Sequence, residues 1–446
     1  MKVLKFGGTS VGKPERMHSV SRIISEGKKN VVVLSAVSGT TNSLVAISEK
    51  ALSGDKGEAL KLTENLFVPF YYEFSDALLS TSEGKRKGKA IIDRHYSFVK
   101  QTIESANPFT ERENKLLLAE GELISTELFQ TYLQEQNFKS VLLPALDFMR
   151  IDENDEPDIA FIEQKLIPLL KQYESYDLYI TQGYICRNAA GDVDNLKRGG
   201  SDYTATLIGA AIRAEEIQIW TDIDGMHNND PRVVKKTFPI PELSFDEAAE
   251  LAYFGAKILH PTCIRPAHER NIPVRLLNTM QPEQKGTVIT HKPSERSVTA
   301  IAAKDNIIAI KIKSARMLLA YGFLRKIFEI FEKYKTPVDM ITTSEVAVSL
   351  TIDDSKNLDA IVSELREFSS VEVDKNQTII CIVGSFDQDK NTAGKKAFSA
   401  LENIPIRMIS YGGSNHNISI LISSEYKHDA LNALNECLFS DVLVNI

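Results

Sequence analysis

The sequence is poor in cysteine. Its 446 residues include only four, at Cys186, Cys263, Cys381 and Cys437. They lie far apart, and no two of them form a Cys-x-x-Cys pair. This spacing argues against a disulfide framework and against a zinc site, and it is typical of a protein whose thiols stay reduced.

Long hydrophobic runs are also missing. No stretch approaches the roughly 20 apolar residues that are needed to cross a membrane. The N-terminus runs from a short apolar strand into Gly7 and Gly8, without the apolar core of a signal peptide. We therefore expect a cytoplasmic protein with no membrane partner.

An excess of positive charge is absent as well. The chain has 52 Lys and Arg against 60 Asp and Glu, which gives a formal net charge of -8. Such a balance argues against binding to nucleic acid, which requires a basic surface, but it leaves a local nucleotide pocket open. The length predicts two or three globular domains.

What the sequence does contain is an alternation of strand and helix patterns in its first two-thirds. Short apolar runs occur at Val31–Leu34, Ser140–Leu143, Leu178–Thr181 and Ile217–Trp220, each followed by a loop of small residues. Continuous apolar strands separated by helices predict an α/β fold with a mostly parallel sheet covered on both faces. Ligands of such sheets bind at the carboxyl ends of the strands.

The texture changes after the polar segment Gln281–Ser297, which we take as a domain boundary. Beyond it, Pro337–Thr342 resembles Pro405–Ser410, and a strand follows each of them. A helix precedes each, expected after Gly322 and after Gly394. The pattern predicts two copies of a βαββαβ unit.

The loop after the first strand is rich in glycine. Gly7 and Gly12-Lys13 match the spacing of a P-loop, but Pro14 stands where a P-loop needs a hydroxyl for Mg²⁺. We therefore reject the P-loop and expect a strand-to-helix turn whose N–H groups cradle phosphate, with Pro14 in the first helical turn. Lys5, at the end of the strand, would neutralise charge on the transferred group.

Two further segments carry polar groups. Hydroxyls at Thr9 and Ser10, and the loop Ser35–Asn42, supply hydrogen-bond donors, although such loops are also common helix entries. Glu122 lies within an apolar helical stretch, Leu116–Leu128. It has the charge to bind an ammonium group, but a helix glutamate more commonly faces solvent.

The most specific local feature is the loop that ends in Arg-Gly-Gly-Ser-Asp. Arg198 offers a planar fork for a carboxylate, and Gly199 and Gly200 let the backbone approach a ligand closely. Ser201 or Asp202 would serve equally well as a helix N-cap, but this reading leaves the Arg-Gly-Gly unexplained.

Acidic and histidine residues give no metal motif. Asp222 and Asp224 lack the further spaced ligands of a calcium loop. We expect neither a metal nor an acid–base role for His260 and His268, and we predict no protein metal site. Lys257, in a Gly-Ala-Lys loop, is a candidate for a nucleotide phosphate.

Taken in order, six segments resemble the aspartokinases of the amino acid kinase family over essentially the whole chain. These segments are Lys5–Val11, Gly121–Glu122, Arg198–Asp202, Thr221–Asp222, Asp230–Arg232 and Gly255–Pro261. The resemblance implies a three-layer α/β/α kinase domain at 1–290, followed by two ferredoxin-like ACT units. These would span 305–376, and 297–304 together with 377–446, with Val298–Lys304 as the upstream strand of the second unit.

The resemblance also implies an activity. The γ-phosphoryl group of ATP, carried with Mg²⁺, would pass to the side-chain carboxylate of L-aspartate, the first step of lysine, threonine and methionine biosynthesis. The implied catalytic residues are Lys5 and Asp202, and the implied aspartate contacts are Thr41, Glu122, Arg198 and Ser201. The implied ATP contacts are Lys5, Gly7, Gly8, Thr221, Asp222, His227, Arg232, Lys257 and Ile258. His227 departs from the tyrosine of a close relative.

The first C-terminal repeat looks like that of lysine-sensitive aspartokinases. The implied effector contacts are Met317, Phe323, Val338, Asp339, Thr343, Ser344 and Glu345. Asp339 and Glu345 would receive ammonium groups. L-lysine is therefore the expected effector, with threonine as the next candidate because Ala320 replaces the serine of a relative. ACT units commonly pair, which implies a homodimer or a dimer of dimers.

The sequence leaves two alternative functions open. A kinase of the same fold would act on another acid, such as glutamate, acetylglutamate or carbamate, but the tandem ACT repeat disfavours this. The other alternative is a catalytically inactive amino-acid sensor. The intact Lys5 and Arg-Gly-Gly-Ser-Asp loops argue against it.

Overall fold

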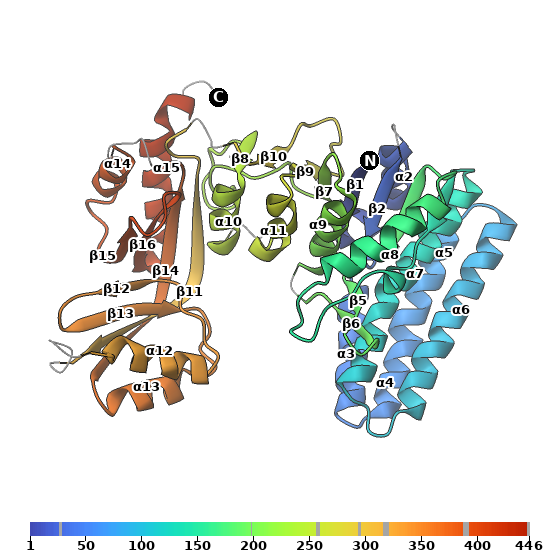
Figure 1. Cartoon of the computed structure of the whole chain (residues 1–446), viewed down its shortest axis with the longest axis horizontal. Helices are drawn as coiled ribbons and strands as arrows, with labels where there is room; N and C mark the ends of the chain where they lie inside the picture. The colour runs from blue at the N-terminus through green and yellow to red at the C-terminus, as the bar shows by residue number, and fades with distance from the viewer. Residues whose placement is uncertain are drawn as a thin grey trace. The chain divides into compact units, whose positions relative to one another are not determined.

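The computed structural model describes residues 1–25, 29–197, 199–255, 259–292, 296–314, 321–386 and 392–443. The chain folds into two compact units (Figure 1). The first consists of Met1–Met226 and Leu259–His291, and the second of His227–Ile258 and Lys292–Ile446.

The first unit is built on a mostly parallel sheet, as the sequence predicts. Its strands lie in the order β3-β4-β2-β1-β7-β9-β10. Neighbours from β3 to β9 are parallel, and β10 is antiparallel to β9. The strands are β1 (Lys2–Phe6), β2 (Asn30–Leu34), β3 (Ser140–Leu142), β4 (Leu178–Gln182), β7 (Ile217–Thr221), β9 (Val274–Asn278) and β10 (Thr287–Thr290).

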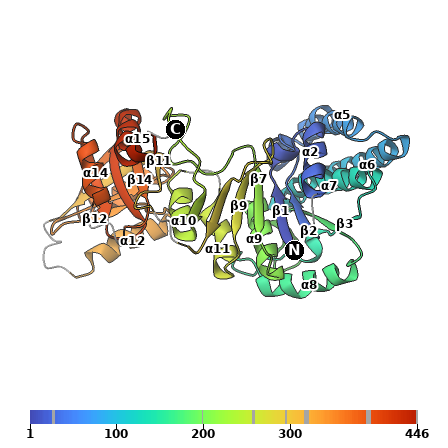
Figure 2. The ribbon, with the colours of Figure 1, turned by 90° about the horizontal axis from the view of Figure 1, so that it is seen from above.

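All four predicted strands are confirmed, because continuous apolar runs suit strands that are covered on both faces. Every residue of β2 and β4 is buried. Figure 2 shows α8, α9 and α11 on one side of the strands and α2, α5, α6 and α7 on the other. The sheet and its helices therefore form three layers.

Two helices of this unit begin at local sequence signals. Pro14 opens α2, and Thr110 and Glu113 form a capping box at the start of α7. The helices are α1 (Gly8–Val11), α2 (Pro14–Ser25), α3 (Thr40–Leu52), α4 (Lys56–Leu62), the π-helical η1 (Thr63–Phe67), α5 (Val68–Leu78), α6 (Ser82–Ser105), α7 (Glu111–Glu135), the 3₁₀-helical η2 (Ala145–Asp147), α8 (Ile159–Gln172), α9 (Gly200–Ile212) and α11 (Pro261–Glu269). A small hairpin, β5 (Ile185–Arg187) and β6 (Val193–Asn195), precedes α9.

The second unit contains a six-stranded antiparallel sheet in the order β12-β13-β11-β14-β16-β15. Its elements are β8 (Glu242–Ser244), α10 (Phe245–Tyr253), β11 (Ala300–Lys313), α12 (Phe323–Lys333), β12 (Ile341–Thr343), β13 (Ala347–Ile352), α13 (Leu358–Arg366), β14 (Ser370–Val383), α14 (Thr392–Ala400), β15 (Ile406–Tyr411), β16 (Asn417–Ser423), η4 (Ser424–Tyr426) and α15 (Lys427–Leu443).

The predicted repeat is present, and its two copies share strands. The 14-residue strands β11 and β14 pair over their whole length, with register shifts near Ile307. The Ala300–Lys304 half of β11 pairs with Ile379–Val383, beside β16. This upstream segment therefore lies beside strands of the second copy.

The helix of each copy is preceded or opened by glycine. Gly322, with φ of 83°, is the N-cap of α12, as predicted. The expectation for the second copy was wrong by a few residues, because α14 begins at Thr392 and Gly394 lies within its first turn. Only the first glycine supplies a left-handed backbone conformation.

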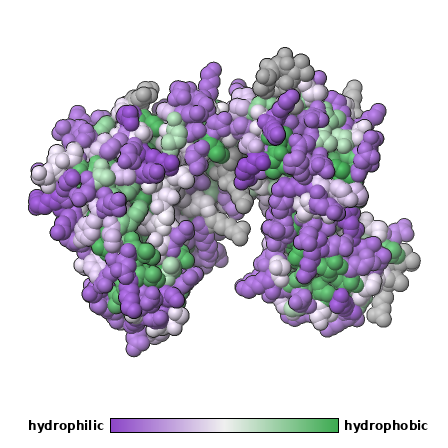
Figure 3. All heavy atoms as spheres, turned by 180° about the vertical axis from the view of Figure 1, so that it is seen from behind, coloured by the Kyte–Doolittle hydropathy of each residue, from purple (hydrophilic) through white to green (hydrophobic). Residues whose placement is uncertain are grey.

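Amphipathic helices cover the sheet of the second unit. Phe323, Ile327, Ile330 and Phe331 recur at helical spacing on α12 and are buried in a core with β11 and β13. A separate core lies beneath α14 and α15. The surface seen in Figure 3 is mostly hydrophilic, and no helix within the described ranges is long and apolar enough to cross a membrane.

Candidate functional site

The loops after four neighbouring strands meet at one edge of the first unit's sheet. The Ser35 N–H donates to the Phe6 carbonyl at 3.1 Å, and the Gly183 N–H donates to the Leu34 carbonyl at 2.8 Å. The parallel strands β4, β2, β1 and β7 thus end together. This is the edge at which open α/β sheets bind ligands.

The glycine loop after β1 packs directly on the hydroxyl loop after β2. A Cβ atom on Gly8 would lie 3.2 Å from the Ala36 carbonyl oxygen, and one on Gly12 would lie 2.8 Å from Ser38 Cβ. A side chain at position 12 would therefore push the two loops apart, and one at position 8 would crowd them. Ser10 does not offer its hydroxyl to a ligand, since its buried Oγ lies 2.7 Å from Thr279 Oγ1.

Lys5 and Asp202 form an ion pair at this edge. Lys5 Nζ lies 2.7 Å from Asp202 Oδ1, and the side chains are only 11% and 16% exposed. A Cβ atom on Gly7 would lie 3.2 Å from the same Nζ, so the lysine ends beneath the glycine loop. A shielded cation beside backbone N–H groups can take up negative charge on a phosphoryl group.

Asp202 is held by the start of α9. The N-cap is Gly199, with φ of 67° and no side-chain cap bond. Ser201 and Asp202 are therefore in the first helical turn, and the N-cap alternative for either residue is wrong. A Cβ atom on Gly183 would lie 2.4 Å from Ser201 Oγ, so the loop after β4 lies against this turn.

Glu122 is buried in this site, although a helix glutamate more commonly faces solvent. It is 5% exposed, and its Oε1 accepts a hydrogen bond from the Ala36 N–H at 3.3 Å. The solvent-facing alternative is therefore wrong, because α7 turns this residue towards the loop after β2. Burial raises the pKa of Glu122 to about 8, although the Ala36 N–H lowers it in part.

Tyr71 is a contact near this site that the sequence did not predict. The fully buried Tyr71 of α5 has its hydroxyl 2.9 Å from Thr40 Oγ1. Thr41, the predicted aspartate contact, is the next residue and is exposed. No local motif marks Tyr71, because its partner lies 31 residues away in the sequence.

The predicted nucleotide contacts divide between the two units. Thr221 ends β7 and donates its hydroxyl to Asp222 Oδ1 at 3.1 Å. In the second unit, His227 Nδ1 lies 3.1 Å from Thr237 Oγ1, and Arg232 makes a paired contact with Asp230 at 2.9 and 2.8 Å. Three predicted substrate and nucleotide contacts lie outside the described residues: Arg198, Lys257 and Ile258.

The two histidines that were expected to be structural make local contacts. His260 is the N-cap of α11, with Nδ1 2.7 Å from Thr262 Oγ1. The ring of His268 lies against that of His291, with 4.6 Å between centroids and the planes tilted by 41°. Within the part of the chain that the structure describes, no group of three His, Cys, Asp or Glu side chains has the arrangement of a metal site.

The predicted effector contacts lie on the first ACT-like copy. Phe323 is buried at the start of α12, and Val338 is half-buried. Thr343, Ser344 and Glu345 are exposed at the turn between β12 and β13. Asp339 differs from them because its side chain is only 1% exposed. Met317 lies outside the described residues.

Comparison with known proteins identifies the family. A model described as the amino acid kinase family matches residues 1–278, and an ACT domain model matches residues 380–438. Aspartokinase 3, chloroplastic, of Arabidopsis thaliana is 36% identical over 98% of this chain and 81% of its own length. The chain belongs to the aspartokinase family. Lysine-sensitive aspartokinase 3 of Escherichia coli is 34% identical over 98% of this chain and 99% of its own.

Solved structures agree with this assignment. E. coli aspartokinase III in complex with aspartate and ADP (R-state) gives a TM-score of 0.83 at 33% identity, covering 98% of this chain and 100% of that one. The same enzyme in complex with lysine and aspartate (T-state) gives 0.80 at 34% identity, with coverage of 98% and 99%. The chain is thus an aspartokinase-family enzyme, an ATP-dependent phosphotransferase with a carboxyl group as acceptor.

Proposed function

We propose that this aspartokinase transfers the γ-phosphoryl group of ATP to the side-chain carboxylate of L-aspartate, giving 4-phospho-L-aspartate and ADP, and that L-lysine inhibits it. The observation that carries the catalytic part is the shielded Lys5–Asp202 pair beneath the glycine loop. Its place at the carboxyl edge of the sheet is where a phosphate and an acidic acceptor have to meet.

The chemistry needs positioning rather than a general base. A carboxylate oxygen of aspartate bonds to the γ-phosphorus while the bridging oxygen of ADP leaves, and no proton has to be removed from the nucleophile. The barrier lies in bringing two anions together, so cations and backbone donors must take up the charge. Lys5 supplies such a cation, and Asp202 holds its ammonium group in place.

Aspartate recognition is assigned to residues around the second loop and the start of α9. Arg198 pairs with the α-carboxylate, and Glu122 receives the ammonium group. Thr41 and Ser201 supply hydroxyls. The burial of Glu122, which faces the loop after β2 through Ala36, supports its role, since a buried carboxylate binds a cation more strongly than an exposed one does.

The nucleotide is assigned to the glycine loop and the segment after β7. Gly7 and Gly8 supply backbone N–H groups for phosphate, and Thr221 and Asp222 contact the nucleoside. His227, Arg232, Lys257 and Ile258 complete the set. ATP is proposed to enter as its Mg²⁺ complex, with most of the metal's ligands coming from phosphate and water.

Regulation is assigned to the C-terminal repeat. We place the ACT units at 305–376 and at 297–304 with 377–446, after a kinase domain at 1–290. Lysine would contact Met317, Phe323, Val338, Asp339, Thr343, Ser344 and Glu345. The similarity to a lysine-sensitive relative, and to a relative solved with lysine, supports this assignment. We propose a cytoplasmic homodimer, or a dimer of dimers, in the biosynthesis of lysine, threonine and methionine.

A kinase assay with a panel of acceptors tests the proposal. ADP formation is measured with ATP, Mg²⁺ and either L-aspartate, L-glutamate, acetylglutamate or carbamate. We expect turnover with L-aspartate and inhibition by L-lysine at millimolar concentrations or lower. Turnover with L-glutamate and not with L-aspartate would reject L-aspartate as the acceptor. Binding of amino acids without turnover of any acceptor would favour the inactive sensor. Inhibition by threonine and not by lysine would identify threonine as the effector.

A further inference from the structure

The carboxylate of Asp339 is already occupied by groups of the same chain. Its Oδ1 accepts hydrogen bonds from Lys304 Nζ at 2.7 Å and from the Tyr253 hydroxyl at 2.8 Å. Its Oδ2 is buried and has no hydrogen-bond partner among the described residues. A buried carboxylate oxygen without a donor is costly. Asp339 therefore has a cation beside one of its oxygens and lacks a hydrogen-bond donor at the other.

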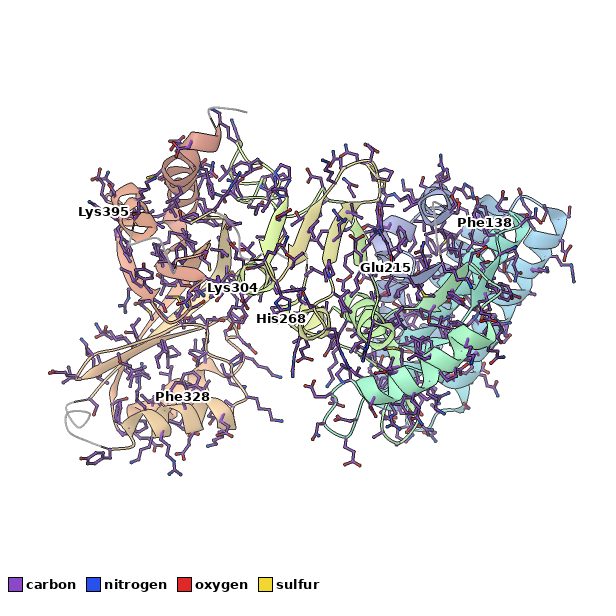
Figure 4. All side chains as sticks on the ribbon, turned by 45° about the horizontal axis from the view of Figure 1, so that its top comes forward. Phe138, Glu215, His268, Lys304, Phe328 and Lys395 are labelled. Atoms are coloured by element: carbon purple, nitrogen blue, oxygen red, sulfur yellow. The ribbon has the colours of Figure 1, made fainter. Side chains whose placement is uncertain are left out.

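Lys304 has a second ion-pair partner besides Asp339. Its Nζ lies 3.0 Å from Asp353 Oδ2 and 4.6 Å from the centroid of the Tyr253 ring. Asp353 is more exposed than Asp339, at 39% against 1%. Lys304, labelled in Figure 4, is thus an ammonium group shared between a buried and a more exposed carboxylate.

We propose that Lys304 is an internal ligand of the effector site, which competes with the effector's ammonium group for Asp339 and so sets the effector's affinity. This inference rests on the proposed function in one respect, that Asp339 receives an ammonium group of the effector. The two competitors are chemically alike, since both present a primary ammonium group to one carboxylate.

The exchange leaves an ammonium group at Asp339 before and after, so this buried carboxylate is never without a cation. An incoming ammonium group replaces Lys304 at Asp339, and Lys304 keeps Asp353 and the Tyr253 ring as partners. The apparent affinity of a ligand falls in proportion to the fraction of its site that is available. The effector can bind Asp339 only in the fraction of protein molecules in which the Lys304–Asp339 bond is broken.

The same cluster connects Asp339 to α10. Tyr253 is the last residue of α10. Two residues later, Gly255 has φ of 123°, and a Cβ atom there would lie 2.3 Å from the Ala303 carbonyl oxygen, next to Lys304 on β11. The Tyr253–Asp339 bond therefore ties the end of α10 to the effector-site carboxylate within the second unit.

Calorimetric titration of the full-length protein with L-lysine tests this inference. In Lys304→Met the competing charge is removed, and we expect the dissociation constant for lysine to fall at least tenfold. Tyr253→Phe loses one donor to Asp339 but keeps the ring, so a smaller decrease in the same direction is expected. Lys311→Met is the matched control, because Lys311 lies on the same strand and pairs with Glu372. Its dissociation constant should stay within twofold of wild type.

The outcomes separate the inference from the proposed function. Wild type that binds lysine, with unchanged or weaker binding in Lys304→Met, would overturn the internal ligand and leave the proposed function intact. Binding by Lys304→Met alone would support it most strongly. If neither protein binds lysine, both the effector assignment and the inference fail. Lys304→Gln, which keeps a polar side chain, is read in the same way should Lys304→Met not fold.

Discussion

Lys5 Nζ lies 2.7 Å from Oδ1 of Asp202, across 197 residues of sequence. Replacing Lys5 by alanine removes the cation beneath the glycine loop. We expect kcat to fall by roughly 10²–10³-fold, the usual effect of losing one electrostatic contact to the transition state. Steady-state kinetics with ATP and L-aspartate measures it.

Asp202→Ala should lower kcat as well, because it leaves Lys5 without the carboxylate that orients it. Lys2→Ala is the matched control, since Lys2 lies on the same strand and pairs at the surface with Glu216. Its kcat should match wild type. Full activity in both Lys5→Ala and Asp202→Ala would remove the catalytic assignment.

The raised pKa of Glu122 predicts a pH dependence of aspartate binding. With a pKa of about 8 in the folded protein, this carboxyl is protonated below pH 8 and has no charge for an ammonium group. The KM for aspartate should therefore rise about tenfold per pH unit as pH falls below 8, while the KM for ATP changes little. KM measured from pH 6 to pH 9 tests this.

Glu122→Gln should give a high KM for aspartate that no longer varies over this range. The variant keeps the size of the side chain and removes only its ionisation. A wild-type KM that is flat from pH 6 to pH 9 would contradict the role of Glu122 as the ammonium partner.

A buried ion pair between α6 and α7 predicts a pH dependence of stability. His95 Nδ1 lies 2.5 Å from Glu120 Oε2, and the side chains are 7% and 5% exposed. Burial lowers the pKa of His95, but the hydrogen bonds with Glu120 and Glu127 outweigh burial and raise that pKa to about 9. The folded protein therefore holds this proton more tightly than the unfolded chain does.

Because the folded pKa exceeds the unfolded value of 6.5, this stabilisation is fully present below pH 6.5 and is lost as pH rises through 9. Burial also raises the pKa of Glu120, which reduces the net gain. We expect His95→Gln to lower the free energy of unfolding by roughly 1–2 kcal/mol more at pH 6 than at pH 9.5. Urea unfolding at both pH values measures it, and equal losses would contradict the pair.

Gly183 predicts a steric link between the loop after β4 and Asp202. A Cβ atom there would lie 2.4 Å from Ser201 Oγ and 2.8 Å from Ser201 Cα. Gly183→Ala should push the first turn of α9 away, lowering kcat at least tenfold and the free energy of unfolding by about 1–3 kcal/mol. In the control Gly57→Ala, the added Cβ atom would lie an ordinary 3.8 Å from Asp55 Oδ1, so kcat should not change.

Local patterns in the sequence predicted the four strands of the first unit and two helix starts correctly. The apolar runs around Val32 and Ile180 form neighbouring parallel strands, and Pro14 and Gly322 mark helix starts. These features depend on residues within one turn or one strand, where burial and backbone preference act over a short range. The P-loop spacing was rejected on the same local grounds, because proline has no hydroxyl.

The orientation of polar side chains was less predictable. Glu122 was expected to face solvent, yet α7 turns it towards Ala36, 86 residues earlier in the chain. Ser201 and Asp202 had an N-cap as their simplest role, yet Gly199 takes that place and frees Asp202 for Lys5. Which face of a helix meets which loop depends on packing between distant segments, and one segment's pattern does not contain it.

The sequence by itself determined the α/β class, the mostly parallel order of the first sheet and the C-terminal repeat, because each follows from periodicity and short-range signals. Tertiary structure alone decided that Lys5 meets Asp202, that Glu122 is buried, and that Lys304 occupies Asp339. The reason is physical: a charge is paired or shielded only when chain segments far apart in sequence come within a few ångströms, and their packing sets that distance.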